Sequence, residues 1–331
     1  MAGLASADNQ ADLEKAILST IVYFDMFDYP LTAVEIWQGL YKEVTSHQLR
    51  VTSYSIWDVV RYLEDSKKIK KYIENKNGFY FLRGRQEIIQ TRHQRYLIGQ
   101  PKWQRAQWIT KKLRLVPFVR LIAVCNKIAY NNAGNDSDID LFIIIKPGRI
   151  WTTRTLVTII TGLLGVRRHD RKIKDRVCLS FYITEKAMDL EKLSATKPDT
   201  HFMYWITQIA PIFSLNETAA AFWQANKWVK KHLPNFTSYQ GVDYQRQIID
   251  SGLTSSWRQT AEKILSGGLG NIIERKLKKL QLKKMSAKTN SARWENNTNV
   301  VVSDDILKFH ERDARMELRR EFLTRLKNIY N

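Results

Sequence analysis

The chain has 331 residues, of which 44% are apolar and 26% are charged, and its formal net charge at pH 7 is +20. This length and composition indicate a globular protein that is long enough for two or three hydrophobic cores. The apolar stretch at residues 156–166 is too short for a membrane helix, which needs roughly 18 apolar residues. Residues 1–10 lack the basic and apolar segments of a secretory signal. We therefore expect a cytoplasmic protein without a membrane partner.

The cysteines argue against two kinds of site, and the charge distribution indicates a class of binding partner. The two cysteines, Cys125 and Cys178, form neither a disulfide framework nor a zinc spacing. We interpret both as small buried residues. The excess of positive charge begins after residue 100, since residues 1–100 contain 13 basic and 12 acidic residues. A charge of this size attracts polyanions, so we expect a nucleic acid or another polyanion as a partner.

Residues 1–85 are predicted to form a first domain of three helices and a hairpin. Apolar residues at helical spacing in residues 13–24 predict the first helix, and the capping box Thr32-x-x-Glu35 predicts the start of the second. We expect Ser53 to begin the third helix. Residues 68–73 and 79–82 then flank Asn75-Lys76-Asn77-Gly78, a strong hairpin signal.

Three helices followed by a hairpin resemble a winged helix. In a DNA reader the third helix presents polar and basic side chains to the groove, whereas this one offers Trp57, Asp58 and Arg61. Its near-neutral charge therefore favours contact with a partner protein, or support of an RNA acceptor, over DNA reading. Two linking helices are expected to follow within residues 86–117, one from Gln86 to Leu97 and one starting at Pro101.

The most informative segment combines acidic residues with a buried strand. Residues 119–125 predict a first strand, and Asp136-Ser137-Asp138-Ile139-Asp140 leads directly into the apolar residues 141–145. Because side chains alternate faces along a strand, Asp138 and Asp140 project to the same side and can share a hard cation. The alternative is a solvated loop whose aspartates cap a turn, which is the reading that we prefer for Asp136.

At this point the chain resembles the polymerase-beta-like nucleotidyltransferase superfamily, and within it bacterial nucleotidyltransferase-domain proteins. These families place Gly-Ser on a turn after a first strand and Asp-hydrophobic-Asp on the next strand. Ser137-Asp138-Ile139-Asp140-Leu141 matches the second motif, whereas Asn126-Lys127 stands at the Gly-Ser position. Asparagine restricts the close approach of a triphosphate that glycine allows and offers an amide instead, while lysine can oppose phosphate charge.

The resemblance implies a metal-dependent site for a nucleoside triphosphate. Asp138 and Asp140 would bind Mg²⁺ or Mn²⁺ and serve catalysis. The expected nucleotide-binding residues are Asn126, Lys127, Ser137, Arg149 and Arg154, with the equal alternative that the two arginines are surface residues beside the helix that follows. The resemblance implies a further carboxylate from a neighbouring strand, and residues 177–183 form the next predicted strand.

By alternation, Cys178, Ser180 and Tyr182 share one face of that strand, and none of them is acidic. We interpret Asp175 and Glu185, before and after the strand, as solvated turn residues. Strand, helix and strand in this order predict a βαβ-like unit.

Residues 118–195 are therefore predicted to be the nucleotidyltransferase core, and residues 196–331 a basic helical C-terminal domain with a mobile loop at 286–299. Ser303 and Asp304 are expected to cap the last helix. Basic residues in the turn after the apolar helix and on two C-terminal helices suit the phosphates of a folded RNA. They are Arg167, Arg168, Arg171, Lys172, Lys276, Lys279, Lys283, Arg319 and Arg320.

The sequence thus predicts an α/β (α+β) fold, in which a small mixed nucleotidyltransferase sheet with helices lies between a winged-helix-like domain and a helical C-terminal domain. The leading hypothesis is transfer of a nucleoside monophosphate from a nucleoside triphosphate to an acceptor, with a tRNA-like RNA favoured by the charge. One alternative is a catalytically inactive protein of this fold that binds nucleic acid or a partner protein. Another is a toxin-like modifier of tRNA or protein.

Overall fold

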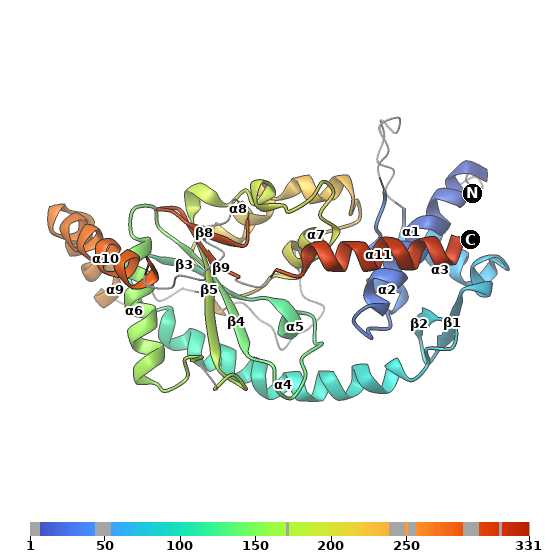
Figure 1. The fold of residues 1–331 in the computed structure, drawn as a ribbon, viewed down its shortest axis with the longest axis horizontal. Coiled ribbons are helices and arrows are strands. Elements are labelled where there is room, and N and C mark those ends of the chain that lie inside the picture. Colours follow the sequence, from blue (N-terminus) through green and yellow to red (C-terminus); the bar gives the residue numbers. More distant parts are fainter. Residues whose placement is uncertain are drawn as a thin grey trace.

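The computed structural model describes residues 7–43, 54–169, 172–237, 249–250, 256–286, 298–310 and 313–330. It is a mixed α/β protein with a central sheet, an N-terminal module at one end and the helix pair α9 and α10 at the other (Figure 1). Among the described residues, no helix combines the length and the apolar character that crossing a membrane requires.

The N-terminal module consists of α1 (Ala7–Asp25), α2 (Ala33–Gln38), α3 (Ile56–Asp65) and the hairpin strands β1 (Ile73–Lys76) and β2 (Phe79–Leu82). The predicted capping box at Thr32 is confirmed, because the Thr32 hydroxyl accepts from the backbone N–H of Glu35 and the Glu35 carboxylate accepts from that of Thr32. A second capping box, formed by Ser55 and Asp58, starts α3.

Two boundaries in this module differ from the sequence prediction. The third helix begins at Ile56 rather than at Ser53, which lies outside the described residues. Residues 69–71 form a 3₁₀ turn, so the first hairpin strand begins only at Ile73. The hairpin turns at Asn77-Gly78, where both residues have positive φ, the conformation that a two-residue turn of this type requires.

A single helix, α4 (Ile88–Leu113), connects the module to the sheet, so the prediction of two linking helices was wrong. Pro101 lies inside α4, although a proline removes one backbone hydrogen bond of a helix. Trp103, Ala106 and Ile109 follow it and are buried in one core with the sheet. This tertiary packing stabilises the helix beyond the proline.

Within the described part of the chain, the sheet has seven strands in the order β7-β6-β3-β4-β5-β9-β8. They are β3 (Val119–Val124), β4 (Ile139–Ile145), β5 (Val177–Thr184), β6 (Ala210–Ser214), β7 (Ile249–Asp250), β8 (Val300–Val302) and β9 (Ile306–Phe309). Strand β3 is antiparallel to both β4 and β6, whereas β4 is parallel to β5 and connects to it through α6 (Ile150–Leu163). The predicted βαβ-like unit is therefore confirmed.

Helices cover both faces of the sheet. Helices α4 and α6 pack in the core that contains Ile143 and Ile145, while α7 (Thr200–Gln208) and α8 (Thr218–Ala225) pack in the core that contains Phe142 and Ile144. This burial explains why β4 is an uninterrupted apolar run from Leu141 to Ile145, since a strand segment that is covered on both sides needs apolar residues at every position.

Residues 196–331 do not form a separate helical domain, because they supply four strands of the sheet. Ser303 and Asp304 lie in the turn between β8 and β9 and do not cap the last helix, α11 (Arg315–Tyr330). Strands of two to five residues are too short to give a clear period in the sequence. Most of the predicted mobile loop at 286–299 lies outside the described residues.

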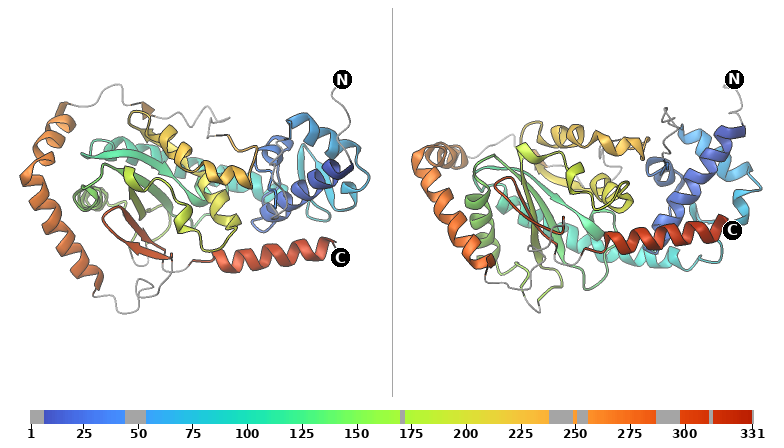
Figure 2. Two further views of the ribbon diagram at one scale, coloured as in Figure 1. Left: turned by 90° about the horizontal axis from the view of Figure 1, so that it is seen from above. Right: turned by 45° about the horizontal axis from the view of Figure 1, so that its top comes forward.

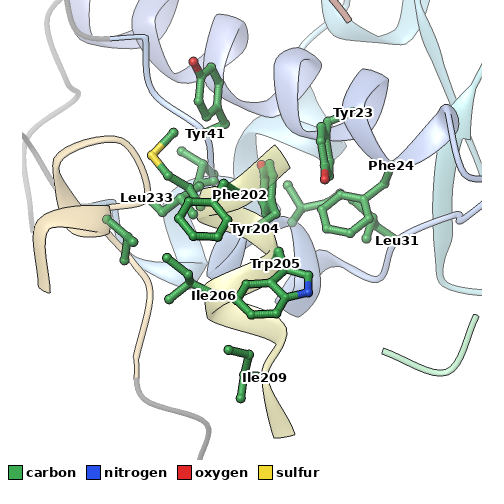
Figure 3. Close-up of a cluster of buried hydrophobic side chains, with 14 of the residues drawn as sticks. Tyr23, Phe24, Leu31, Tyr41, Phe202, Tyr204, Trp205, Ile206, Ile209 and Leu233 are labelled. Atoms are coloured by element: carbon green, nitrogen blue, oxygen red, sulfur yellow. The ribbon is translucent and has the colours of Figure 1, made fainter. Parts of the chain in front are cut away.

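The last helix returns to the N-terminal module. In Figure 2, α11 extends from the sheet to the end of the molecule that carries α1. Phe322 packs edge-on against Tyr23 and Tyr41, and Arg325 forms an ion pair of 2.7 Å with the buried Asp25. Figure 3 shows part of the same core around α7, where Tyr23 of α1 lies beside Tyr204. The two rings stack with their centroids 4.1 Å apart. The module thus shares one core with one face of the sheet.

The helix pair α9 (Ser256–Ser266) and α10 (Gly268–Ser286) lies beside α6. The Glu274 carboxylate of α10 accepts hydrogen bonds from the backbone N–H groups of Trp151 (2.9 Å) and Thr152 (2.8 Å) in the first turn of α6. An acidic group at this helix end is favourable, because it meets unpaired N–H groups and the positive end of the helix dipole. This contact fixes α10 to the sheet.

Candidate metal and nucleotide site

Asp138 and Asp140 stand at the start of β4 and line one cavity, as the alternation of the strand predicts. A ligand atom of Cys178 joins their carboxylate oxygens, and the three atoms all lie within 4.8 Å of one another. Asp140 and Cys178 are register partners on the parallel strands β4 and β5. The two aspartates and Cys178 are therefore arranged as a candidate metal site, and we call them the acidic cluster.

Cys178 is the member of the acidic cluster that the sequence analysis missed. A register shift in β5 pairs Asp140 with Cys178 but Phe142 with Phe181. The irregularity breaks the simple alternation, and Tyr182 belongs to the core on the other side of the sheet from Phe181. The expectation that Cys178, Ser180 and Tyr182 share one face was therefore wrong for Tyr182. Cys125 is buried as predicted, whereas Cys178 is half-buried at the cavity.

Burial and nearby negative charge make two members of the acidic cluster, Asp140 and Cys178, hold their protons more tightly than free side chains do. Burial, followed by the charge of Asp138, raises the pKa of Asp140 to about 6, although hydrogen bonds from Asn126 and Cys178 and the charge of Arg168 oppose this shift. Burial and the charge of Asp140 raise the pKa of the Cys178 thiol to about 12. A divalent cation would relieve the repulsion between the carboxylates, so the electrostatics favour one here.

The donor set fits a hard cation through its two carboxylates. Carboxylate oxygens suit Mg²⁺ and Mn²⁺, whereas a thiol is a soft ligand and coordinates as a thiolate. Because its pKa is raised to about 12, the Cys178 thiol adds an uncharged group and not another anion. Asp138 and Asp140 are the residues that would hold Mg²⁺ or Mn²⁺.

Arg168 belongs to this site, although the sequence analysis placed it with the residues that bind nucleic acid. Its Nη1 donates to Oδ2 of Asp138 at 2.5 Å and lies 3.9 Å from Sγ of Cys178. The Arg168 side chain is 43% exposed, while that of Asp138 is 16% exposed. The Arg168 guanidinium therefore neutralises one of the two aspartates from the solvent side.

Asn126 and Lys127 lie beside the aspartates, where the resemblance to nucleotidyltransferases implies the Gly-Ser turn. Asn126 has φ of 58°, a left-handed conformation that glycine and asparagine adopt more easily than other residues. Its Oδ1 accepts a 2.8 Å hydrogen bond from Nε1 of Trp205. Lys127 is exposed and lines the cavity, whereas Ile128 is buried in the core with the sheet. Lys127 thus faces the same cavity as Asp138 and Asp140.

A buried lysine holds the loop that carries the aspartates. Nζ of Lys102, on α4, donates to the carbonyl oxygens of Asn135 (3.0 Å) and Ser137 (2.9 Å) and forms an ion pair with Asp175. The Ser137 hydroxyl accepts from the backbone N–H of Gly134 at 3.0 Å. Lys102 is 3% exposed, and nothing in the pattern of α4 distinguishes it from a surface lysine.

Asp175 therefore anchors Lys102 and is not a free turn residue, and it adds no carboxylate to the acidic cluster. Glu185 follows the far end of β5, and its Oε2 lies 4.0 Å from Nε of Arg120. Neither acid completes the site, as the sequence analysis expected.

Two adjoining cavities open at this edge of the sheet. The first has a volume of about 580 Å³ and the second about 840 Å³, and both are lined by Asn126, Lys127, Asp140, His201 and Trp205. Volumes of this size are typical of small-molecule sites. A substrate in either cavity would contact Lys127 and Asp140.

The second cavity adds three side chains that no sequence motif predicted, Ser180, Lys308 and His310. Oγ of Ser180 and Nε2 of His310 lie 3.2 Å apart, and Lys308 is only 2% exposed. Burial, followed by the charge of Arg315, lowers the pKa of Lys308 to about 8, and burial lowers the pKa values of His201 and His310 to about 4. Both histidines are consequently uncharged at neutral pH.

Arg149 and Arg154 lie away from the acidic cluster, so the prediction that they bind the nucleotide was wrong. Arg149 follows the opposite end of β4 and donates to the carbonyl oxygens of Leu265 (2.9 Å) and Ser266 (3.0 Å) at the junction of α9 and α10. Arg154 hydrogen bonds to Gln281 of α10. Arg149 immediately precedes α6, and Arg154 lies within it. The N-terminus of α6 is directed away from the aspartates, and the two arginines bind the helix pair α9 and α10.

The remaining basic residues do not form one surface. Lys276, Lys279 and Lys283 are exposed on α10, whereas Arg320 is exposed on α11 and Arg319 is half-buried there. Helix α10 lies at one end of the molecule, whereas α11 runs from the sheet to the other end (Figures 1 and 2). The two sets of basic residues that were predicted to suit the phosphates of one folded RNA therefore lie on separate parts of the molecule.

In the basic turn after α6, the side chain of Arg168 contacts the acidic cluster. Arg167 is half-buried and pairs through its backbone with Val177, and Lys172 is exposed. Arg171 lies outside the described residues.

No family model, curated protein or solved structure matches this chain.

Proposed function

We propose that the protein is a metal-dependent nucleotidyltransferase that transfers a nucleoside monophosphate from a nucleoside triphosphate to an acceptor. The observation that carries this proposal is the convergence of Asp138 and Asp140 with Lys127 on one cavity at the end of adjacent strands. A nucleoside triphosphate needs cation ligands for its phosphates and a counter-charge beside them, and these three side chains supply both.

The reaction would begin with an acceptor hydroxyl that attacks the α-phosphorus. A new phosphoester bond forms, the hydroxyl proton passes to water, the bond between the α-phosphorus and its bridging oxygen to the β-phosphate breaks, and pyrophosphate leaves with the electron pair. Bound Mg²⁺ or Mn²⁺ would neutralise the charge that develops on the phosphate oxygens. Asp138 and Asp140 hold this cation, and the Lys127 ammonium opposes the charge of the phosphate tail.

Arg168 has a role in the same scheme. A cation at Asp138 competes with the guanidinium, because both bind the same carboxylate. Released from Asp138, the long and half-exposed side chain can turn to the phosphates, which it can bind through two N–H groups. Arg168 would then support the negative charge of the leaving pyrophosphate.

An RNA acceptor is favoured by the charge of the chain. The net charge is +20, and exposed lysines line α10 on the opposite side of the sheet from the acidic cluster. A folded RNA, such as a tRNA-like molecule, is long enough to contact both regions. Its phosphates would release counterions on binding, so the affinity should fall steeply with salt.

A second function is favoured by one specific observation. The ion pair between Arg168 and Asp138 neutralises this aspartate without a metal, which suits a catalytically inactive protein that keeps the fold to bind RNA or a partner protein. In that case Arg168 would be a permanent structural partner of Asp138.

Labelled nucleotides separate the two functions. The protein is incubated with total RNA, Mg²⁺ or Mn²⁺, and each nucleoside triphosphate labelled at the α-phosphate; a parallel series carries the label at the γ-phosphate. Nucleotidyl transfer labels the acceptor from the α-position only, and Asp138→Asn or Asp140→Asn should abolish the signal. Asp136→Asn, an exposed residue of the same loop, is the matched control and should retain it. Absence of α-label in both RNA and protein, with RNA binding that the aspartate substitutions leave intact, would establish the inactive alternative.

A further inference from the structure

The first cavity is lined by two chemically different sets of side chains. One set is polar and includes Lys127, Asp138 and Asp140, while the other is aromatic and includes Phe27 and Tyr130. The aromatic set comes in part from the N-terminal module, since Phe27 follows α1. Because Asp138 and Asp140 would hold a cation beside Lys127, a ligand that fits this cavity has an anionic end and a flat apolar end.

Phe27 and Tyr130 are the aromatic rings that a ligand can reach most easily. Both are partly exposed, whereas the neighbouring Tyr23 and Phe24 are 4% and 7% exposed. Tyr130 packs edge-on against Tyr29 with ring centroids 5.5 Å apart. An aromatic ring with one partly open side offers a surface on which a planar group can stack.

The wall that carries Phe27 is held in place from several elements. Its carbonyl oxygen accepts from Nη1 of Arg95 on α4 at 2.6 Å and from Nδ2 of Asn132 at 3.0 Å. Tyr23, one turn earlier, has its hydroxyl 2.9 Å from Nδ1 of His201 on α7. Because this wall is already fixed, a ligand that stacks on it need not order it, and more of the contact free energy appears as affinity.

We propose that the first cavity is a nucleobase subsite, in which the base of the nucleoside triphosphate stacks on Phe27 and Tyr130 while its phosphates extend toward Lys127 and Asp140. This inference rests on the proposed function and adds the position of the base. It makes the N-terminal module a wall of the substrate site, a role that the resemblance to a winged helix does not suggest.

Calorimetry with two kinds of ligand tests this assignment on the full chain. The ligands are the four α,β-methylene nucleoside triphosphates, which cannot release pyrophosphate in the normal way, and inorganic tripolyphosphate, each with Mn²⁺. Phe27→Ala should weaken the best-bound nucleotide by roughly 5- to 150-fold, the range for loss of one base-stacking contact, and leave tripolyphosphate unchanged. Trp57→Ala, at a residue of the same module that is 71% exposed, is the matched control and should change neither affinity.

A second pair of variants tests the subsite at another residue, so that the test still holds if Phe27→Ala does not fold. Tyr130→Phe keeps the ring and should retain nucleotide affinity, whereas Tyr130→Leu should lose it while both proteins still bind tripolyphosphate. Circular dichroism confirms that each variant is folded.

Three outcomes would overturn the subsite. Equal binding of nucleotide and tripolyphosphate by the wild-type chain would show that the base makes no contact, although the proposed function would survive. Loss of affinity for an RNA oligonucleotide in Phe27→Ala, with unchanged nucleotide binding, would assign the cavity to the terminal base of the acceptor instead. Failure of the wild-type chain to bind either nucleotide or tripolyphosphate would reject the subsite and the proposed function together.

Discussion

The guanidinium of Arg168 and the carboxylate of Asp138 lie 2.5 Å apart, and the arginine approaches from the solvent side of the site. A metal ion and this guanidinium would compete for one carboxylate. The ion pair is partly exposed, so its contribution is modest and of the order of 1 kcal/mol.

Removing this competitor should tighten metal binding. We expect Arg168→Ala to increase the affinity for Mn²⁺ without nucleotide by about fivefold, which is the equivalent of roughly 1 kcal/mol. The same variant should bind a nucleoside triphosphate more weakly, because it lacks a phosphate ligand. Titration of Mn²⁺ followed by electron paramagnetic resonance measures the first effect. Arg167→Ala, at the neighbouring residue whose backbone pairs with Val177, is the control. Weaker Mn²⁺ binding in Arg168→Ala would refute the competition.

Asp140 should destabilise the metal-free protein at neutral pH. Its pKa is raised to about 6, whereas an unfolded chain has about 3.9, so the folded state binds more protons between these values. The contribution of Asp140 to stability therefore falls as the pH rises from about 4 to 6. Asp140→Asn should accordingly be more stable than the wild type above pH 6, by roughly 1–3 kcal/mol, and equally stable near pH 4.

Urea unfolding at several pH values with a chelator present measures this difference. Asp136→Asn, which replaces an exposed aspartate of the same loop, should show no such gain. A lower stability of Asp140→Asn at pH 7 would mean that the carboxylate makes a net favourable contact in the free protein.

Lys102 should be essential for the position of the aspartate loop. Lys102→Met would leave the carbonyl oxygens of Asn135 and Ser137 without this donor, and we expect a loss of about 2–4 kcal/mol in the free energy of unfolding. Metal affinity should fall with it, because the loop that leads into Asp138 is no longer held. Lys111→Met, on the exposed side of the same helix, should change stability by less than about 0.5 kcal/mol. Unchanged stability and metal binding in Lys102→Met would show that the loop holds its shape by itself.

The lysines of α10 should contribute phosphate contacts to RNA binding. Replacing Lys276, Lys279 and Lys283 with glutamine should reduce the slope of log affinity against log salt concentration by about 2–3, since each neutralised phosphate contributes about 0.7–0.9. Fluorescence anisotropy with a labelled tRNA at several salt concentrations gives the slope.

The matched control for α10 is the triple substitution of Lys67, Lys70 and Lys71, which are exposed in the N-terminal module. It removes the same charge from another surface. Equal loss of slope in both triple variants would mean that RNA responds to the total charge and has no preferred contact with α10.

Local signals in the sequence predicted the parts of this fold that depend on neighbouring residues. The capping box at Thr32, the hairpin turn at Asn77-Gly78 and the unit of β4, α6 and β5 are all present. The same holds for Asp138 and Asp140, because two-residue alternation at a strand start places both on one side.

The remaining features depend on contacts between distant segments. The register shift in β5 brings Cys178 to Asp140, and an irregular strand has no simple periodic signature. The role of Lys102 depends on a loop more than thirty residues later. Arg149 was misassigned because the sequence does not show that its guanidinium meets the junction of α9 and α10.

The pairing of Asp25 with Arg325 joins residues that are 300 positions apart, and Phe322 of the same helix fills the space between Tyr23 and Tyr41. A ribosome must therefore synthesise nearly the whole sequence before the N-terminal helices can form their contacts with α11. Until then their aromatic surface is open to chaperones or to other nascent chains. An isolated fragment of residues 1–85 would keep this surface uncovered, which makes it a poor choice for separate expression.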